Sequence, residues 1–138
     1  MNTNLDFCLA LYRAQASLQL KLDDELGTYH GISFSDFTLL NVIARSDGGR
    51  VNISVLGEQI CKPQSALVRQ LIVLEKIGLV ARDSTNGLRQ VILRAPGRVL
   101  VNVARETAAS VGTKALESFT PAVVATVFAA MVTLANAS

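Results

Sequence analysis

The sequence has few of the residues that metal sites, disulfide frameworks and catalytic centres require. It contains no tryptophan, two cysteines and one histidine in 138 residues. Cys8 and Cys61 form no C-x-x-C pair, and His30 stands alone, so we expect no metal site and no structural disulfide. No glycine-rich phosphate loop and no nucleophile beside a base is recognisable either. We therefore expect no cofactor and no enzymatic activity.

Charged residues are also scarce, at 17%, whereas 50% of the residues are apolar. This composition excludes disorder, and the length suits a single domain over residues 1–138. The apolar content is high for so short a chain, which suggests that a second subunit covers part of its surface. The N-terminus lacks the basic region of a signal peptide, so we expect a cytoplasmic protein without a membrane segment.

The distribution of charge along the chain indicates the expected binding partner better than the net charge of +2 does. Residues 62–94 carry six basic and two acidic side chains, while the first fifty residues carry four basic and six acidic ones. Basic charge concentrated in one segment is typical of a surface that binds phosphate groups. Double-stranded DNA is therefore the expected partner.

Two helices are predicted in the first fifty residues. The first covers residues 5–26, is capped by Thr3 or Asn4 and ends before Gly27. The first turns of this helix are apolar on nearly every side, so other parts of the protein must pack against them on every side. The second begins after the capping hydroxyls of Ser33 and Ser35 and ends at the glycines that follow residue 47.

Residues 52–94 predict a helix-turn-helix followed by a β-hairpin. Asn52 caps a short helix through residue 60, and Pro63 opens a second helix that Gly78 ends. Two strands, residues 79–82 and 90–93, then flank an Asn-Gly turn at residues 86–87. This order of elements is that of a winged helix.

Two further helices are predicted, over residues 96–118 and 122–135, and the second contains no charged residue. An uncharged helix can belong to the core of one chain, to a dimer interface or to a membrane tail, for which this one is short. A dimer interface is favoured, because a monomer would leave one apolar face uncovered. The predicted fold is mainly α with a small β-hairpin wing. It has a winged helix at residues 32–94 and dimerisation helices at residues 1–28 and 96–138.

Three segments resemble those of the MarR family of winged helix-turn-helix transcription regulators. Residues 74–82, LEKIGLVAR, are similar to the family's L-E-x-x-G-L-[IV]-x-R junction between recognition helix and wing. Residues 32–40, ISFSDFTLL, resemble its L-[ST]-x-x-[QE]-F-x-x-L segment, and residues 56–60, LGEQI, its L-A-x-x-[LI]. The resemblance implies a homodimer that binds a double-stranded DNA operator.

The apolar residues of the fourth predicted helix leave Gln64, Ser65 and Arg69 on the opposite face, which a recognition helix presents to the major groove. Glutamine suits adenine and arginine suits guanine, so Gln64 and Arg69 are expected to read bases, with Ser65 and Lys62 on phosphate. The alternative is that these side chains form an ordinary solvent-exposed face and contact no DNA. Arg89, at the position of the family's wing arginine, is expected in the neighbouring minor groove.

Cys8 and Tyr12 lie one helical turn apart, and residues 8–12, CLALY, resemble the C-x-x-L-Y of the family's organic-peroxide-sensing branch. A sensing thiol must be accessible and partly ionised. The competing interpretation is a small cysteine that is inert because apolar side chains bury it, and we favour this interpretation. The second tyrosine that this branch usually supplies farther along the first helix also has no counterpart in the stretch from Leu18 to Leu26. Cys61, in the turn before the recognition helix, is a rival for the redox role.

These observations predict a sequence-specific DNA-binding regulator, most simply a repressor released by a small-molecule effector. The resemblance implies a small aromatic or anionic effector bound between the dimerisation helices and the winged domain. Two alternatives remain at this stage. One is a peroxide-sensing repressor that uses Cys8, and the other is a winged-helix module that binds protein and not DNA.

Overall fold

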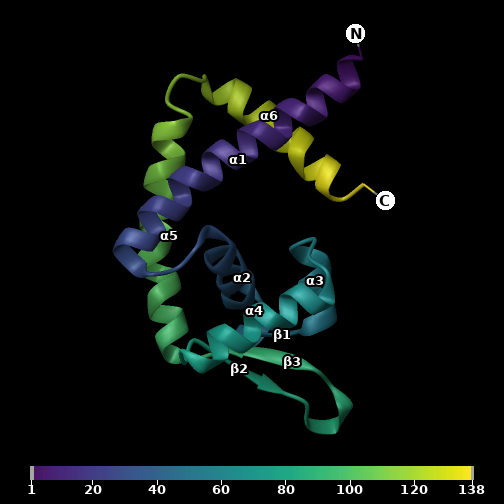
Figure 1. Ribbon diagram of the computed structural model, residues 1–138, viewed down its shortest axis with the longest axis vertical. Coiled ribbons are helices and arrows are strands. Elements are labelled where there is room, and N and C mark those ends of the chain that lie inside the picture. Colours follow the sequence, from purple (N-terminus) through teal and green to yellow (C-terminus); the bar gives the residue numbers. More distant parts are fainter. Residues whose placement is uncertain (1, 138) are drawn as a thin grey trace.

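The computed structural model describes residues 2–137, which form six α-helices, two short 3-10 helices and one three-stranded sheet. Figure 1 shows the hairpin at one end of the molecule and the N-terminus and α6 towards the other. The elements are α1 (Thr3–His30), α2 (Phe34–Arg45), η1 (Asp47–Gly49), β1 (Arg50–Asn52), α3 (Ile53–Gln59), α4 (Gln64–Lys76), β2 (Val80–Asp83), η2 (Thr85–Gly87), β3 (Gln90–Leu93), α5 (Ala95–Ala115) and α6 (Pro121–Ala135).

Helix α1 is longer at both ends than the sequence predicts. The Asn2 side chain caps it by accepting a hydrogen bond from the Leu5 amide, at 3.0 Å, in place of Thr3 or Asn4. The helix continues through Gly27 and ends at Gly31, whose φ of 69° is left-handed. The expected end before Gly27 is therefore wrong, because the conformation that ends a helix and favours glycine occurs four residues later.

The helix-turn-helix forms as predicted. Ser33 and Asp36 build a capping box at the start of α2, and the Asn52 side chain caps α3. In α4, Leu67, Leu71 and Leu74 are buried. They join residues of α2, α3, α5 and the sheet in one apolar core, which holds α4 at a fixed angle to the rest of the domain.

The wing is a three-stranded antiparallel sheet in the order β1-β3-β2. The predicted strands β2 and β3 and the Asn-Gly turn are confirmed, with Asn86 and Gly87 at φ of 59° and 74°. Strand β1, in which Arg50 pairs with Ile92 and Asn52 with Gln90, was not predicted. Its three residues, RVN, are too few for the alternation of polar and apolar residues to indicate a strand.

Helix α5 connects the wing to the opposite end of the molecule and packs against α1 and α2 (Figure 1). Near the wing, Gly97 approaches the backbone so closely that a Cβ there would lie 2.3 Å from the Leu79 carbonyl oxygen. Farther along, the His30 ring and the Thr107 hydroxyl are 2.7 Å apart and link α1 to α5. These contacts fix the long helices relative to the winged helix.

The first half of α1 and all of α6 extend beyond this core. None of the residues of α6 is buried, and Phe128 is 67% exposed. In α1, Phe7 is 56% exposed, and the first buried residue is Leu22. Among residues 2–137, no helix is long and apolar enough to cross a membrane. The single chain therefore leaves an extensive apolar surface at the end opposite the wing.

Candidate nucleic-acid interface

One face of α4 is polar and solvent-exposed. Gln64, Ser65 and Arg69 are all exposed on it, which confirms the face that helical spacing predicts. The Gln64 amide donates a hydrogen bond to the Ile53 carbonyl oxygen at 3.3 Å, which ties the start of α4 to the start of α3. Residues Leu67 and Leu71 hold the opposite face in the core. The arrangement presents a guanidinium, an amide and a hydroxyl from one rigid helix.

The Lys62 side chain lies elsewhere. Its half-buried amine donates hydrogen bonds to the Ser35 hydroxyl at 3.1 Å and to the Gln70 side-chain oxygen at 2.6 Å. The Gln70 amide nitrogen in turn donates to Ser35 at 3.1 Å and to an Asp36 carboxylate oxygen at 2.8 Å. We call these four residues the Lys62 cluster. The cluster uses two of the three donors of the Lys62 ammonium group, and the expected phosphate contact of Lys62 stays a prediction.

The wing carries basic side chains in two different environments. Arg89 is exposed and follows the turn at its tip. Arg82 instead pairs with Glu75 of α4, with Nε and a carboxylate oxygen 3.1 Å apart, and its backbone amide donates to the other oxygen at 3.0 Å. The two hydrogen bonds from Arg82 lower the pKa of Glu75. Arg82 therefore fastens the wing to α4, whereas the Arg89 side chain makes no hydrogen bond or ion pair within residues 2–137.

The hairpin is also braced at its tip. The Thr85 hydroxyl and backbone amide both donate to the Asp83 carboxylate, and these hydrogen bonds lower the pKa of Asp83. Arg50 was not predicted as part of the basic surface. It joins the sheet through β1 and donates to the Gln90 side chain at 3.2 Å.

Both cysteines are exposed in the single chain. The expectation of a buried Cys8 is therefore wrong for one subunit, because the first half of α1 extends beyond the domain core. Tyr12 is 76% exposed, and no hydrogen bond to the Cys8 sulfur occurs within residues 2–137. Cys61 lies between α3 and α4 with a left-handed φ of 53°, and its sulfur is 3.8 Å from the Glu58 carbonyl oxygen.

A cavity of about 260 Å³ lies between α1, α2 and the turn that precedes α4. It separates the long N-terminal helix from the winged helix, which is where the resemblance implies an effector. Among residues 2–137, the only charged residue that lines it is Lys62 of the Lys62 cluster. The lining residues are Gln15, Gln19, Phe34, Ser35, Thr38, Leu39, Ile60 and Lys62.

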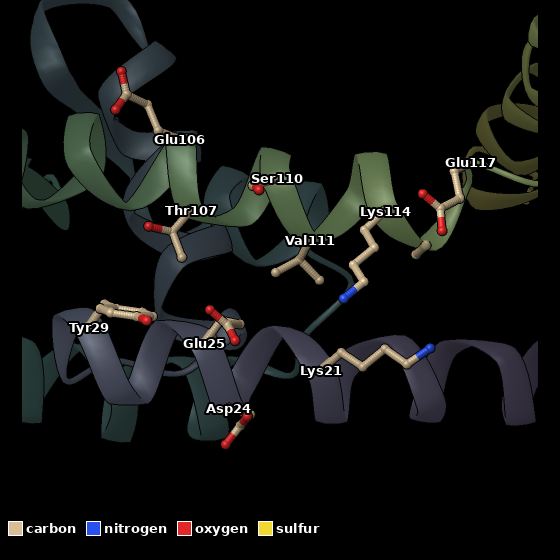
Figure 2. Close-up of a pocket in the computed structure, with 11 residues that line it drawn as sticks. Lys21, Asp24, Glu25, Tyr29, Glu106, Thr107, Ser110, Val111, Lys114 and Glu117 are labelled. Atoms are coloured by element: carbon tan, nitrogen blue, oxygen red, sulfur yellow. The ribbon is translucent and has the colours of Figure 1, made fainter.

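A larger cleft of about 880 Å³ lies between α1 and α5. Two lysines and four carboxylates line it, so its charge is mixed. Figure 2 shows Lys114 reaching from α5 towards α1, with Glu25 and Tyr29 on the facing helix, while Asp24 and Glu106 point away from the gap. No residue of α3, α4 or the wing borders this cleft.

Solved structures with the same fold are MarR family transcriptional regulators. One from Rhodococcus sp. RHA1 matches with a TM-score of 0.87 and 18% identity over 99% of this chain and 98% of the other. One from Streptomyces coelicolor, solved in complex with DNA, matches with a TM-score of 0.86 and 21% identity over 98% of this chain and 88% of the other. CouR from Rhodococcus jostii RHA1, bound to p-coumaroyl-CoA, matches with a TM-score of 0.86 and 18% identity over 96% of this chain and 93% of the other.

No protein-family model matches the sequence, and no curated protein sequence matches it. The likeness therefore comes from the fold, over almost the whole length of both chains. This chain has the fold of the MarR family regulators, a winged helix set between long terminal helices.

Proposed function

We propose that this protein is a sequence-specific DNA-binding transcription regulator that acts as a homodimer and has no enzymatic activity. The observation that carries the proposal is the exposed polar face of α4, with Gln64, Ser65 and Arg69, on a helix that the core and the Arg82–Glu75 pair hold beside the wing. A rigid helix of this kind can enter the major groove while the wing contacts the adjacent backbone and minor groove.

The proposed contacts follow from side-chain chemistry. Arg69 can donate two hydrogen bonds to guanine, and Gln64 can pair with adenine once its amide leaves the Ile53 carbonyl oxygen. Ser65 contacts phosphate, and Arg89 enters the minor groove, where groove width guides it more than base identity. The Streptomyces coelicolor structure with the same fold was solved in complex with DNA, which supports this use of the fold.

The proposed dimer rests on the apolar surface at the end opposite the wing. Residues of the first half of α1 and of α6 are exposed there, and α6 has no charged residue with which to solvate one of its faces. A second copy of the same chain can cover both helices around a twofold axis. Two copies of α4 would then face successive major grooves of a pseudo-palindromic operator.

The proposed mode of regulation is repression that a small molecule relieves. CouR, which has the same fold, was solved with p-coumaroyl-CoA bound, and this supports an effector for the present chain. The cavity between α1, α2 and the turn before α4 is the proposed site, since it touches both the long N-terminal helix and the winged helix. A ligand there can alter the spacing of the two recognition helices.

The decisive experiment selects duplexes from a random library with the purified protein and then titrates the selected duplex at several salt concentrations. Contacts with phosphate release counterions, so we expect the affinity to fall about a thousandfold between roughly 50 and 200 mM salt for six or more phosphate contacts. A scrambled duplex of equal length is the control for specificity. Failure to enrich any duplex, or an affinity for the duplex that does not change with salt concentration, would favour a winged-helix module that binds protein.

A further inference from the structure

Gln70 is a half-buried polar residue in the middle of α4, next to Arg69 of the exposed face. Its side chain turns away from that face towards α2. The amide nitrogen donates to the Ser35 hydroxyl at 3.1 Å and to an Asp36 carboxylate oxygen at 2.8 Å. The amide oxygen accepts a hydrogen bond from the Lys62 amine at 2.6 Å. Both donors and the acceptor of this amide therefore have partners outside α4.

The α2 end of these hydrogen bonds is itself held in place. The second Asp36 carboxylate oxygen accepts from the Ser33 amide at 3.3 Å, and the Ser33 hydroxyl accepts from the Asp36 amide at 3.0 Å. One carboxylate oxygen thus belongs to the capping box of α2, and the other receives the Gln70 amide. The capping box thereby fixes the acceptor to which α4 is attached.

The contacts that hold α4 are of two kinds. Its buried leucines pack in the core, and apolar attraction depends on the area covered and not on direction. Hydrogen bonds weaken steeply when their angle changes, so they resist a rotation of the helix about its axis. Within residues 2–137, three side chains of α4 link it to other elements in this way, namely Gln64 at its start, Gln70 in its middle and Glu75 near its end.

We propose that Gln70 is a positioning residue for base recognition. It fixes the rotation of α4 and with it the direction of the adjacent Arg69 side chain, while Gln70 itself contacts no DNA. A group that reads a base has to be held to within roughly 0.5 Å. Phosphate contacts carry no sequence information, so loss of the Gln70 links changes discrimination between duplexes and not general affinity. The inference rests on the proposed function, because it requires that Arg69 reads a base.

The test measures the affinities of the selected and the scrambled duplex by fluorescence anisotropy at matched salt. Gln70→Met keeps the length of the side chain and removes its hydrogen bonds. We expect the ratio of the two affinities to fall about tenfold, which corresponds to one weakened base contact. The affinity for the scrambled duplex and its dependence on salt should stay as in the wild type. Gln15→Met, the same exchange on an exposed residue of α1, is the matched control and should keep the wild-type ratio.

A pair of substitutions can restore the link in a different chemical form. Gln70→Glu alone places a second carboxylate beside Asp36, and the two like charges repel each other. Asp36→Asn in the same chain supplies an amide donor to the new carboxylate and keeps an oxygen that can accept from the Ser33 amide. We expect Gln70→Glu to lose discrimination and the double variant to recover most of the wild-type ratio. Circular dichroism at the assay temperature establishes that each variant is folded.

Three results refute the inference while the wild type still prefers the selected duplex. They are a wild-type ratio in Gln70→Met, an equal loss of affinity for both duplexes in folded Gln70→Met, and a double variant that does not discriminate. The third result decides even where both single Gln70 variants unfold, because the double variant retains the links. A wild-type protein without preference for the selected duplex refutes the proposed function instead, and the inference falls with it.

Discussion

Arg69 and Arg89 belong to different elements, so their truncation should have different effects on the selected duplex. Arg69 lies on the exposed face of α4, and Arg89 follows the turn at the tip of the wing. Arg69→Ala should cost roughly 1–3 kcal/mol of specific affinity and relax the base preference at one position. Arg89→Ala should weaken the binding of duplexes with a narrow minor groove more than that of other duplexes. Fluorescence anisotropy at matched salt measures both.

Lys114→Ala is the control for these variants, because Lys114 lies at the far end of α5 from the wing. It should bind the duplex as the wild type does. Wild-type affinity in both arginine variants would contradict the docking of α4 and the wing.

The two thiols lead to a prediction about oxidation. Cys8 and Cys61 are accessible in the single chain, yet no hydrogen bond to the Cys8 sulfur occurs within residues 2–137, and the partner of Cys61 is a backbone carbonyl. A sensing thiol needs a neighbouring group that stabilises the thiolate, and no ion pair or donated hydrogen bond to either sulfur occurs in the described part of the chain. We therefore expect cumene hydroperoxide to leave duplex binding intact. Anisotropy before and after treatment of the reduced protein measures this.

Cys8→Ser and Cys61→Ser separate the two sites in the same experiment. Release from DNA that occurs in the wild type and is absent in Cys8→Ser would establish peroxide sensing through Cys8. Release that is absent only in Cys61→Ser would identify the turn before α4 as the sensor.

Among the elements, the junction of α5 with the wing tolerates the least change. A Cβ at Gly97 would lie 2.3 Å from the Leu79 carbonyl oxygen and 2.7 Å from a Leu93 methyl carbon. Gly97→Ala forces these backbone segments apart and should lower the free energy of unfolding by roughly 1–3 kcal/mol. Gly112→Ala, on the same helix with no neighbour within 4 Å, should raise it by about 0.5–1 kcal/mol. Urea titrations followed by circular dichroism give both values.

If Gly97→Ala is as stable as Gly112→Ala, the close approach of α5 to the wing is incorrect. The pair is well matched because both substitutions add the same methyl group to the same helix.

Most element boundaries could be predicted because they depend on local chemistry. The Ser33–Asp36 capping box, the Asn52 cap and the Asn-Gly turn act over three or four residues, and the structure contains all three. β1 could not be predicted, since its three residues become a strand only by pairing with β3. The end of α1 was placed too early because glycine is tolerated within a helix, as at Gly27, at a modest cost.

In the candidate site, too, some residues could be placed from the sequence and others could not. Periodicity alone put Gln64, Ser65 and Arg69 on the exposed face of α4. It could not place the amine of Lys62, because a long flexible side chain takes its partners from distant segments, here Ser35 of α2 and Gln70 of α4. Gln70 was missed for the same reason.

For the whole molecule, the apolar end opposite the wing leads to a prediction about assembly. Val127 and Phe128 are exposed on α6, at 44% and 67%. A carboxylate placed in an apolar interface is costly, so Val127→Asp or Phe128→Asp should shift the protein from dimer to monomer and lower its stability together. Sedimentation velocity over a range of micromolar concentrations measures the first effect, and thermal unfolding measures the second.

Val73→Asp serves as the control, because Val73 is an exposed apolar residue of α4, far along the chain from α6. It should remain dimeric. A wild-type protein that sediments as a well-folded monomer at micromolar concentration would contradict the proposed assembly.

The absence of a buried residue in α6 also determines when its backbone amides can exchange with solvent. A helix of 15 residues is barely stable alone, so in the proposed dimer the protection of these amides comes from association with the second copy. Deuterium uptake in α6 should therefore accelerate on dilution below the dimer dissociation constant. Uptake around Leu40 and Leu71, which are fully buried within one chain, should depend much less on concentration. In the proposed dimer, protein concentration thus controls local opening at the end that carries α6, while the end that carries the wing stays closed.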